Sequence, residues 1–500
     1  MKSFSSLAVL TVVLASPLPS AAEQVRPNVL WICADDLAPY AIGSYGCRRA
    51  QTPNMDRLAR QGVRFDRAFC NSPVCTASRQ SFLTGMYPRT LGVTALKTPL
   101  PESAVTLAEV LAEAGYETAA FGKMHFNSDL KHGFQTRLDL KDHKRRFASR
   151  PVPALPKDVA VLPAWRPFKD PASVWLNSAC LPMGARESDM PGTYFAEEAS
   201  RFLLGEHRRP FFLMVSFYEP HSPFHFPLEY RGRHKPEEFS VPPLGKDDHQ
   251  QVPAIFKDLK DHEKQGIAAA YHTSVEFLDA NVGRVLAALR QANLEGNTLV
   301  VLTGDHGYLL GHHGRFEKHC CFEQAVRSPL IIAFHQRFPS GQSTEALVEF
   351  IDIAPTILSV CGVAQPRSMQ GRDLTPLLMG KAASLRDQVF VEYAENEEAM
   401  VRTPQWKLIY TTGARQREDG YATDLPLMGR KVRLYDLQAD PEELHNLADL
   451  TEYSARVEEL TRLLADHLVR TARRPELIPK TNDVHRLLSH CLKPDDVTGP

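Results

Sequence analysis

Four apolar stretches of the sequence each end in polar residues that could bind an ion or transfer a proton. Acidic residues often follow strands, so one such set would carry little weight. In an open sheet of parallel strands, however, ligands bind beyond the carboxyl ends of the strands. Four sets in equivalent positions therefore predict an active site, built from Asp35 and Asp36, Lys123 and His125, Glu219 and His221, and Asp305 and His306.

Three of these residues, Asp35, Asp36 and Asp305, are predicted to converge on one point. Three carboxylates cannot all stay ionised at close range without a cation. Oxygen ligands of this kind suit a hard divalent ion such as Ca²⁺ or Mg²⁺, while His306 leaves Zn²⁺ or Mn²⁺ open. Ca²⁺ is favoured because the N-terminus predicts export, and because the set lacks the additional histidines that a pair of zinc ions would need.

Cationic side chains accompany the acids. Lys123, Lys318 and Arg79 beside a metal ion would form a pocket for an anion, and tetrahedral oxyanions such as sulfate or phosphate fit that description. His125 and His221 could transfer protons near neutral pH. The residue types therefore predict a site that binds such an anion next to a metal ion.

The stretch NSPVCTASRQSFLTG, residues 71–85, places Cys75 at the predicted start of a helix, one turn before Arg79. An anion or a metal-bound oxygen is favoured there, because a helix N-terminus carries a partial positive charge. The sequence holds nine cysteines, an odd number, and their pairing cannot be deduced from spacing. A disulfide with Cys70 is the structural alternative to a role in catalysis.

The elements that must position these residues alternate between strand and helix. Continuous apolar runs predict strands that are buried on both faces, and periodic segments with capping residues predict the helices between them. This alternation indicates an α/β fold with a mostly parallel sheet covered by helices on both faces. The predicted strands lie within residues 27–36, 116–123, 211–221 and 297–307, and the predicted helices within residues 52–62, 106–115, 267–290 and 349–363.

The chain changes character near residue 385. The short apolar runs QVFVEY, KLIY and VRLYDL are typical of antiparallel strands, so a smaller C-terminal α+β lobe is predicted over residues 385–475, after a catalytic domain over residues 23–384. The tail, residues 476–500, has no clear pattern. Two segments rich in proline and charge, residues 141–192 and 231–265, are predicted as loops on the functional face, although solvated insertions would look the same.

The N-terminus is typical of a secretory signal peptide. Lys2 precedes an apolar run from Leu7 to Ala15, and cleavage is predicted near Ala22, which removes residues 1–22. We expect a periplasmic or secreted protein with no membrane span after cleavage, and a retained anchor is the alternative. The 58 Lys and Arg nearly balance the 59 Asp and Glu, which argues against nucleic acid as a partner.

With these motifs in place, the sequence resembles the type I sulfatases of the alkaline phosphatase superfamily over about residues 26–460. The Asp305–His306 pair is similar to that of iduronate-2-sulfatase, choline sulfatase and phosphonate monoester hydrolases, which points away from simple aryl substrates. Ala77 lies where proline is the commoner family residue. The signature is CTASRQSFLTG, and the other motifs in the family's order are PNVLWICADD, GKMHF, EPHSPFHFP, TGDHGYLLGHHGRFEK and RLYDLQADPEELHNLAD.

The resemblance implies an alkaline-phosphatase-like fold and a modified nucleophile. Cys75 would be oxidised by a formylglycine-generating or anaerobic sulfatase-maturating enzyme to Cα-formylglycine (3-oxoalanine), whose aldehyde hydrates to a diol. One hydroxyl would attack sulfur and displace the alcohol, and deprotonation of the other would expel sulfate. One calcium ion would be held by residue 75 together with Asp35, Asp36, Asp305 and His306.

The resemblance also implies roles for the residues around the metal ion. Arg79 and Lys123 would position and neutralise the diol, and His125 would be the base for sulfate release. His221 and Lys318 would bind the sulfate oxygens and protonate the leaving group, and the sequence leaves open which of the two is the acid.

The expected substrate is a sulfated carbohydrate, because exported sulfatases with long loops often act on sulfated polysaccharides. One alternative is a phosphonate monoester or phosphodiester hydrolase of the same superfamily. A metal-dependent phosphatase would need a histidine-rich two-metal site, and an inactive exported carbohydrate-binding homologue would keep Cys75 unmodified. The residues predicted to contact the sugar are Glu219, His225, His312, His313 and Arg315.

Overall fold

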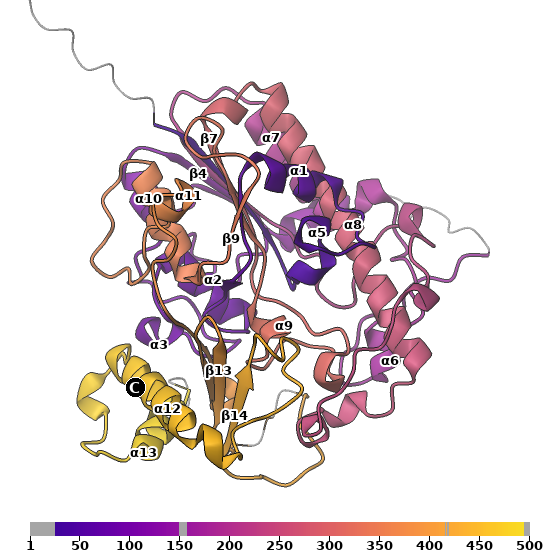
Figure 1. The fold of residues 1–500 in the computed structure, drawn as a ribbon. Coiled ribbons are helices and arrows are strands. Elements are labelled where there is room, and N and C mark those ends of the chain that lie inside the picture. The colour runs from indigo at the N-terminus through magenta and orange to yellow at the C-terminus, as the bar shows by residue number, and fades with distance from the viewer. Residues whose placement is uncertain (1–25, 150–157, 416, 418–419, 495–500) are drawn as a thin grey trace, which may run out of the picture.

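An eight-stranded sheet forms the centre of the molecule (Figure 1). The computed structural model describes residues 26–149, 158–415, 417 and 420–494. The strands are β1 (Asn28–Ala34), β2 (Val63–Phe65), β4 (Glu117–Gly122), β5 (Thr136–Leu138), β6 (Phe211–Ser216), β7 (Thr298–Gly304), β8 (Leu330–Ala333) and β9 (Gln342–Thr344). Their order is β5-β4-β6-β1-β7-β8-β2-β9, and the neighbouring pairs are parallel except those that β8 makes with β7 and β2. The predicted α/β class with a mostly parallel sheet is confirmed.

Helices cover both faces of this sheet, as Figure 1 shows. On β1, Val29 and Trp31 belong to one hydrophobic core, and Leu30 and Ile32 belong to the other. Because both faces are buried, the strand is apolar at every position and its sequence does not alternate. The first core includes α2 (Cys75–Thr84), α4 (Leu107–Glu113) and α10 (Ile353–Val360), and the second includes α1 (Pro53–Gln61), α7 (Pro191–Leu203) and α8 (Asp261–Gln291).

The strand order brings the four predicted polar sets to one edge of the sheet. β1 lies between β6 and β7, and β4 lies beside β6. These four strands are parallel and end level to within one residue: Gly122 pairs with Ser216, Ser216 pairs with Cys33, and the last pair of β1 and β7 is Ala34 with Gly304. The side chains that follow them therefore meet beyond the carboxyl ends of the strands.

A smaller lobe follows, in orange and yellow in Figure 1. The strands β11 (Val389–Tyr393), β12 (Glu398–Arg402), β13 (Trp406–Thr411) and β14 (Lys431–Asp436) form the predicted antiparallel sheet. One face packs on α12 (Ser454–Arg470) and α13 (Val484–Cys491), while Met400 and Ile409 on the other face join the first core. The predicted domain boundaries at residues 384 and 475 stay predictions. The helix α13 lies within the tail, residues 476–500, where the sequence showed no clear pattern.

Two segments that were expected to be irregular contain helices. α5 (Leu140–Phe147) begins at Asp139, whose side chain caps it, and its sequence LKDHKRRF is too charged to show an apolar period. α6 (Ala172–Trp175) and the start of α7 also lie within residues 141–192, and α8 begins inside residues 231–265. The remaining short elements are α3 (Pro88–Leu91), α9 (Glu323–Val326), α11 (Thr375–Leu378), β3 (Ala68–Phe69) and β10 (Val348–Glu349).

Three sequence expectations concern export and cysteine pairing. The predicted signal peptide, residues 1–22, lies outside the described residues. Within the described ranges, none of the helices combines the length and the hydropathy needed to span a bilayer. All nine cysteines lie in those ranges and are free thiols, so Cys75 and Cys70 form no disulfide.

A buried ion-pair cluster joins the smaller lobe to the main domain and makes the first prediction. Lys407 on β13 is fully buried, and its ammonium lies 2.8 Å from Glu443 and 3.3 Å from Glu323, on α9. Lys407→Met leaves two buried carboxylates short of a cation, so we expect the free energy of unfolding to fall by about 3 kcal/mol or more. Urea unfolding measures it, with the exposed Lys381→Met as control. Equal unfolding midpoints for the two variants would contradict this account.

Candidate active site

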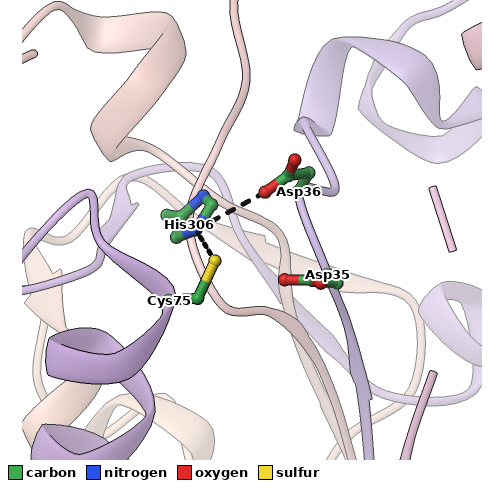
Figure 2. Close-up of side chains that lie close together, drawn as sticks. All are labelled: Asp35, Asp36, Cys75 and His306. Carbon is green, nitrogen blue, oxygen red and sulfur yellow. Dashed lines mark hydrogen bonds and ion pairs between the residues drawn. The ribbon is translucent and has the colours of Figure 1, made fainter. Parts of the chain in front are cut away.

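Cys75 and three residues from the strand ends meet in one buried cluster. The Cys75 Sγ lies 3.1 Å from Nε2 of His306, which follows β7. Asp35, Asp36, Cys75 and His306 each offer one ligand atom, and these atoms all lie within 4.8 Å of one another. Figure 2 shows the four side chains pointing toward one another. The structure thus brings the sequence-predicted cysteine, two of the acids and a histidine to one point.

Asp305 organises the backbone around this cluster. Its Oδ1 accepts hydrogen bonds from the backbone N–H groups of Asp36 and His306, both at 3.0 Å. Asp36 has a left-handed φ of 64°, which aspartate tolerates better than most residues. Tyr271 on α8 donates from its hydroxyl to the Asp36 carbonyl at 2.6 Å. Asp305 therefore fixes both the turn that follows β1 and the turn that follows β7.

Arg79 connects α2 to all four strand ends. Its Nε donates to Asp305 Oδ2 at 2.9 Å, and its Nη2 lies 3.3 Å from Asp35 Oδ1. Its Nη1 donates to the Lys123 carbonyl at 2.6 Å and to the Ser216 hydroxyl at 2.7 Å. The side chain is only 1% exposed. The planar guanidinium is suited to this geometry because it donates in several fixed directions.

The two lysines approach the carboxylates from other elements. The Lys123 ammonium pairs with Asp35, and the Lys318 ammonium lies 2.9 and 3.0 Å from the two carboxylate oxygens of Asp36. Burial alone would raise the pKa of both acids, but the charge of Lys123 lowers the pKa of Asp35 well below its usual value, and that of Lys318 lowers the pKa of Asp36. Both carboxylates are therefore ionised and suited to a cation.

Gly122 lets β4 and β6 stay paired up to the residue before Lys123. Gly122 has a φ of +105°, and a Cβ there would lie 1.8 Å from the carbonyl oxygen of Ser216. That carbonyl accepts a hydrogen bond from the Lys123 backbone N–H at 2.8 Å. A residue with a side chain at position 122 would force β4 and β6 apart, so the glycine fixes where Lys123 begins.

The histidine tautomers follow from their hydrogen bonds. Nδ1 of His306 lies 2.9 Å from the Gly307 carbonyl oxygen, and Nδ1 of His221 lies 2.8 Å from that of Ser222. A carbonyl can only accept, so each Nδ1 carries the proton and each Nε2 presents its lone pair to the cluster. Burial, reinforced by the nearby lysines, lowers the pKa of His221 to about 4 and that of His125 to about 2. Both rings are therefore neutral, and burial together with the nearby positive charge disfavours their protonation.

A cavity of about 230 Å³ opens above this cluster. Its floor holds the polar side chains of Cys75, Lys123, His125, His221 and Lys318. Its walls are mainly apolar and include Leu96, Trp165, Pro167, Phe168, Tyr308 and Tyr421. The cavity therefore combines a charged floor with an aromatic mouth.

The five predicted sugar contacts are not among the residues that line this cavity. Glu219 is 3% exposed and faces Gly192 at the start of α7, and burial raises its pKa to about 7. His313 pairs with Asp248 at 3.0 Å and stacks on Phe322. His225 is half-buried, His312 lines a different pocket, and Arg315 pairs with buried Glu317 beside a further cavity.

Comparison with known proteins identifies the family. Residues 27–363 match the family described as Sulfatase, and residues 311–470 match the one described as N-sulphoglucosamine sulphohydrolase, C-terminal. The chain belongs to the sulfatase family. The prediction that it is a sulfatase, made from the signature around Cys75 together with the other motifs in the family's order, is therefore confirmed.

The similarity to curated sulfatases extends over most of each chain. A protein named Sulfatase from Formosa agariphila is 28% identical and covers 88% of this chain and 87% of its own length. The iduronate 2-sulfatase of Mus musculus is 26% identical and covers 85% of this chain and 87% of its own. The predicted resemblance to sulfatases of the iduronate type is thus supported by a relative of that name.

Solved structures share the fold at lower identity. The phosphonate monoester hydrolase of Agrobacterium radiobacter has a TM-score of 0.76 at 23% identity and covers 92% of this sulfatase and 98% of its own chain. A protein solved with its substrate D-glucosamine-2-N,6-O-disulfate has a TM-score of 0.69 at 22% identity and covers 92% and 99%. The predicted alkaline-phosphatase-like architecture is confirmed.

The walls of the cavity are what sequence reasoning missed. Trp165 and Phe168 are each 45% exposed, and Trp165 lies 5.9 Å from the His221 ring between centroids. Two large aromatic residues in a segment rich in proline and charge were the available signal. Tyr421 carried no such signal, because it belongs to none of the motifs, and His319 was not singled out although it directly follows Lys318.

The bracing role of Arg79 makes the second prediction. A lysine has one donor group and cannot reproduce four interactions, so Arg79→Lys in this sulfatase should lower the free energy of unfolding by about 3 kcal/mol and abolish turnover of the folded fraction. Arg89→Lys is the matched control, since Arg89 is also buried and paired, with Glu392, but lies away from the cavity. It should lose stability and keep turnover. Loss of turnover in both variants would contradict a specific role for Arg79.

Proposed function

We propose that this sulfatase hydrolyses sulfate esters of carbohydrates, using an aldehyde made from Cys75 and one calcium ion. The observation that carries the proposal is the cluster in which Cys75 meets two ionised carboxylates and a histidine nitrogen. Two lysines border the cluster, and an aromatic cavity opens above it.

The donor atoms of the cluster fit a hard divalent cation. Asp35 and Asp36 offer ionised carboxylates, and His306 offers the Nε2 lone pair. The Oδ2 of Asp305 accepts a hydrogen bond from Arg79. Its Oδ1 lies 3.6 Å from the His306 Nε2, close enough to serve as a further ligand of the same cation. Two or three carboxylates favour calcium over zinc. A calcium ion held there would supply Lewis-acid stabilisation of the negative charge that develops during ester cleavage.

Residue 75 would supply the nucleophile. In the proposed form an aldehyde hydrate at this position supplies one hydroxyl for attack on sulfur and a second for release of sulfate. Cys75 is 2% exposed in the folded chain. A maturating enzyme therefore has to reach the thiol before the chain closes around it.

The cationic and imidazole groups handle the anion and the protons. Lys123 and Lys318 provide the positive charge that the sulfate oxygens need in a site sheltered from water. His125 lines the cavity, and its Nδ1 has no hydrogen-bond partner in the described residues, so it would accept the proton during sulfate release once the bound anion offsets the charge of Lys123 that helps to hold its pKa low. His221 and Lys318 both lie at the cavity floor beside Asp36, and of the two Lys318 carries the proton for the leaving alcohol, whereas neutral His221 would first have to gain one at Nε2.

The walls favour a sugar as the alcohol. Exposed aromatic rings such as Trp165 and Phe168 can stack on the apolar face of a pyranose, while the anion lies on the floor. The relative named iduronate 2-sulfatase and the structure solved with a glucosamine disulfate both point to sugar sulfates. We propose export as well, on the basis of the signal peptide predicted over residues 1–22.

The third prediction tests the chemistry at residue 75. Trypsin cleaves after Arg67 and Arg79, so mass spectrometry of the peptide from Ala68 to Arg79 should show the aldehyde in protein from its native host. That protein should release inorganic sulfate from a sulfated oligosaccharide, and Cys75→Ser should release none.

The same assay separates the alternatives. A phosphodiester turned over faster than every sulfate ester would favour the phosphonate hydrolase alternative, which shares the fold. An intact thiol together with no sulfate release would support the inactive homologue and overturn the proposal.

The fourth prediction tests the metal ion. Calcium at about 100 times its Kd should stabilise the protein by about 2.7 kcal/mol, because it binds only the folded chain, and chelator should reverse this. Asp36→Asn should abolish the calcium-dependent rise in Tm. Asp248→Asn is the control, because Asp248 is also buried but pairs with His313 away from the cluster. A calcium-dependent shift that survives in Asp36→Asn would rule out this site.

A further inference from the structure

A second cavity, of about 130 Å³, lies beside the catalytic one, where the β13–β14 loop meets residues 250–251 and Arg315. Its lining is strongly cationic, and Glu398 is the one acidic side chain among the described residues that line it. The cations are Arg315, Arg415, Arg417, Lys431 and Arg433.

Among the described residues, two acids, Glu317 and Glu398, line this cavity or contact its cations, against five cations. Glu317 is buried and gives one negative charge to two guanidinium groups, those of Arg315 at 2.5 Å and Arg417 at 3.3 Å. Glu398 supplies the second negative charge but pairs with none of these cations: its Oε1 accepts from the Cys321 backbone N–H, and its Oε2 accepts from the Thr411 hydroxyl. The remaining cations therefore face the cavity in excess.

Two of these cations lie on one face of β14. Lys431 and Arg433 alternate with Val432 and Leu434, which pack toward α12 on the other face. In the described part of the chain neither cation takes part in an ion pair: Lys431 contacts the side-chain carbonyl of Gln250, and the Nε of Arg433, a residue 6% exposed, has no hydrogen-bond partner. Burial and the charge of Arg433 lower the pKa of Lys431. A buried cation without a partner is costly, so this geometry favours an anionic ligand.

The two cavities share a wall. Tyr421 lines both, and the Arg417 guanidinium lies 5.3 Å from the centroid of its ring. His319 lines the catalytic cavity, while its carbonyl oxygen accepts hydrogen bonds from Arg315 at 3.1 Å and from Arg417 at 3.2 Å. The two cavities are therefore neighbours, separated by Tyr421 and the residues around it.

We propose that the second cavity binds an anionic group, a sulfate or a carboxylate, carried by the sugar next to the one whose sulfate ester lies at residue 75. The inference rests on the proposed function and narrows its substrate to an oligosaccharide with at least two anionic groups. Specificity then comes from the C-terminal lobe, because Lys431 and Arg433 belong to β14.

Lys431→Gln tests the proposal, with Arg462→Gln as the control, since Arg462 is an exposed cation on α12 of the same lobe. Two disaccharides serve as substrates, one with a second anionic group and one without it. Wild type should prefer the doubly anionic one in kcat/KM. Lys431→Gln should lower kcat/KM for that substrate about tenfold, the value of one charge-assisted hydrogen bond, and leave the other unchanged. Arg462→Gln should change neither.

Binding to the Cys75→Ala chain separates this proposal from the proposed function. Titration calorimetry with the same disaccharides needs no turnover, so it works on an inactive protein. Adding Lys431→Gln to the Cys75→Ala chain should raise the Kd of the doubly anionic disaccharide about tenfold and leave the Kd of the other disaccharide unchanged. Equal affinity for both disaccharides, unchanged by Lys431→Gln, overturns the inference. It is also overturned if inorganic sulfate alone binds in a Lys431-dependent way while the disaccharides are not distinguished, because the cavity would then hold only a free anion.

Discussion

The balance of buried charge at the carboxyl edge of the sheet is the constraint on which the rest of the structure depends. An ion buried without a partner costs several kcal/mol, so acids gathered to bind a cation must be compensated before that cation arrives. The chain does this with equal numbers of acids and bases held within ion-pair distance. The acids are Asp35, Asp36 and Asp305, and the bases are Arg79, Lys123 and Lys318.

The compensating bases come from separate elements, and this is what makes the site rigid. Arg79 arrives on α2, Lys123 follows β4, and Lys318 lies beyond β7. Any shift of one element breaks an ion pair that is shielded from water, where the penalty is largest. The position of Cys75 follows from the same constraint, because it begins the helix that Arg79 fixes to the strand ends.

The catalytic floor could be predicted from the sequence, because its residues follow apolar strands whose parallel pairing determines where they meet. The walls could not. Tyr421 reaches the cavity from the loop after β13, and Trp165 reaches it from a segment with no period, so neither position is encoded by local pattern. β12 was missed for a related reason: Glu398 and Arg402 bracket its three apolar residues, and only tertiary ion pairs and hydrogen bonds make their burial acceptable.

The floor and the walls of the catalytic cavity are therefore subject to different physical constraints. The floor has to hold charges at fixed distances, so it lies on strand ends that the two hydrophobic cores hold in place. The walls come from separate segments, mainly residues 165–168 and the β13–β14 loop with Tyr421, although Tyr421 and the wall residue Tyr308 also contact the second core. Because that loop also lines the cationic cavity, the smaller lobe, whose described residues make none of the ion pairs of the cluster, borders both cavities.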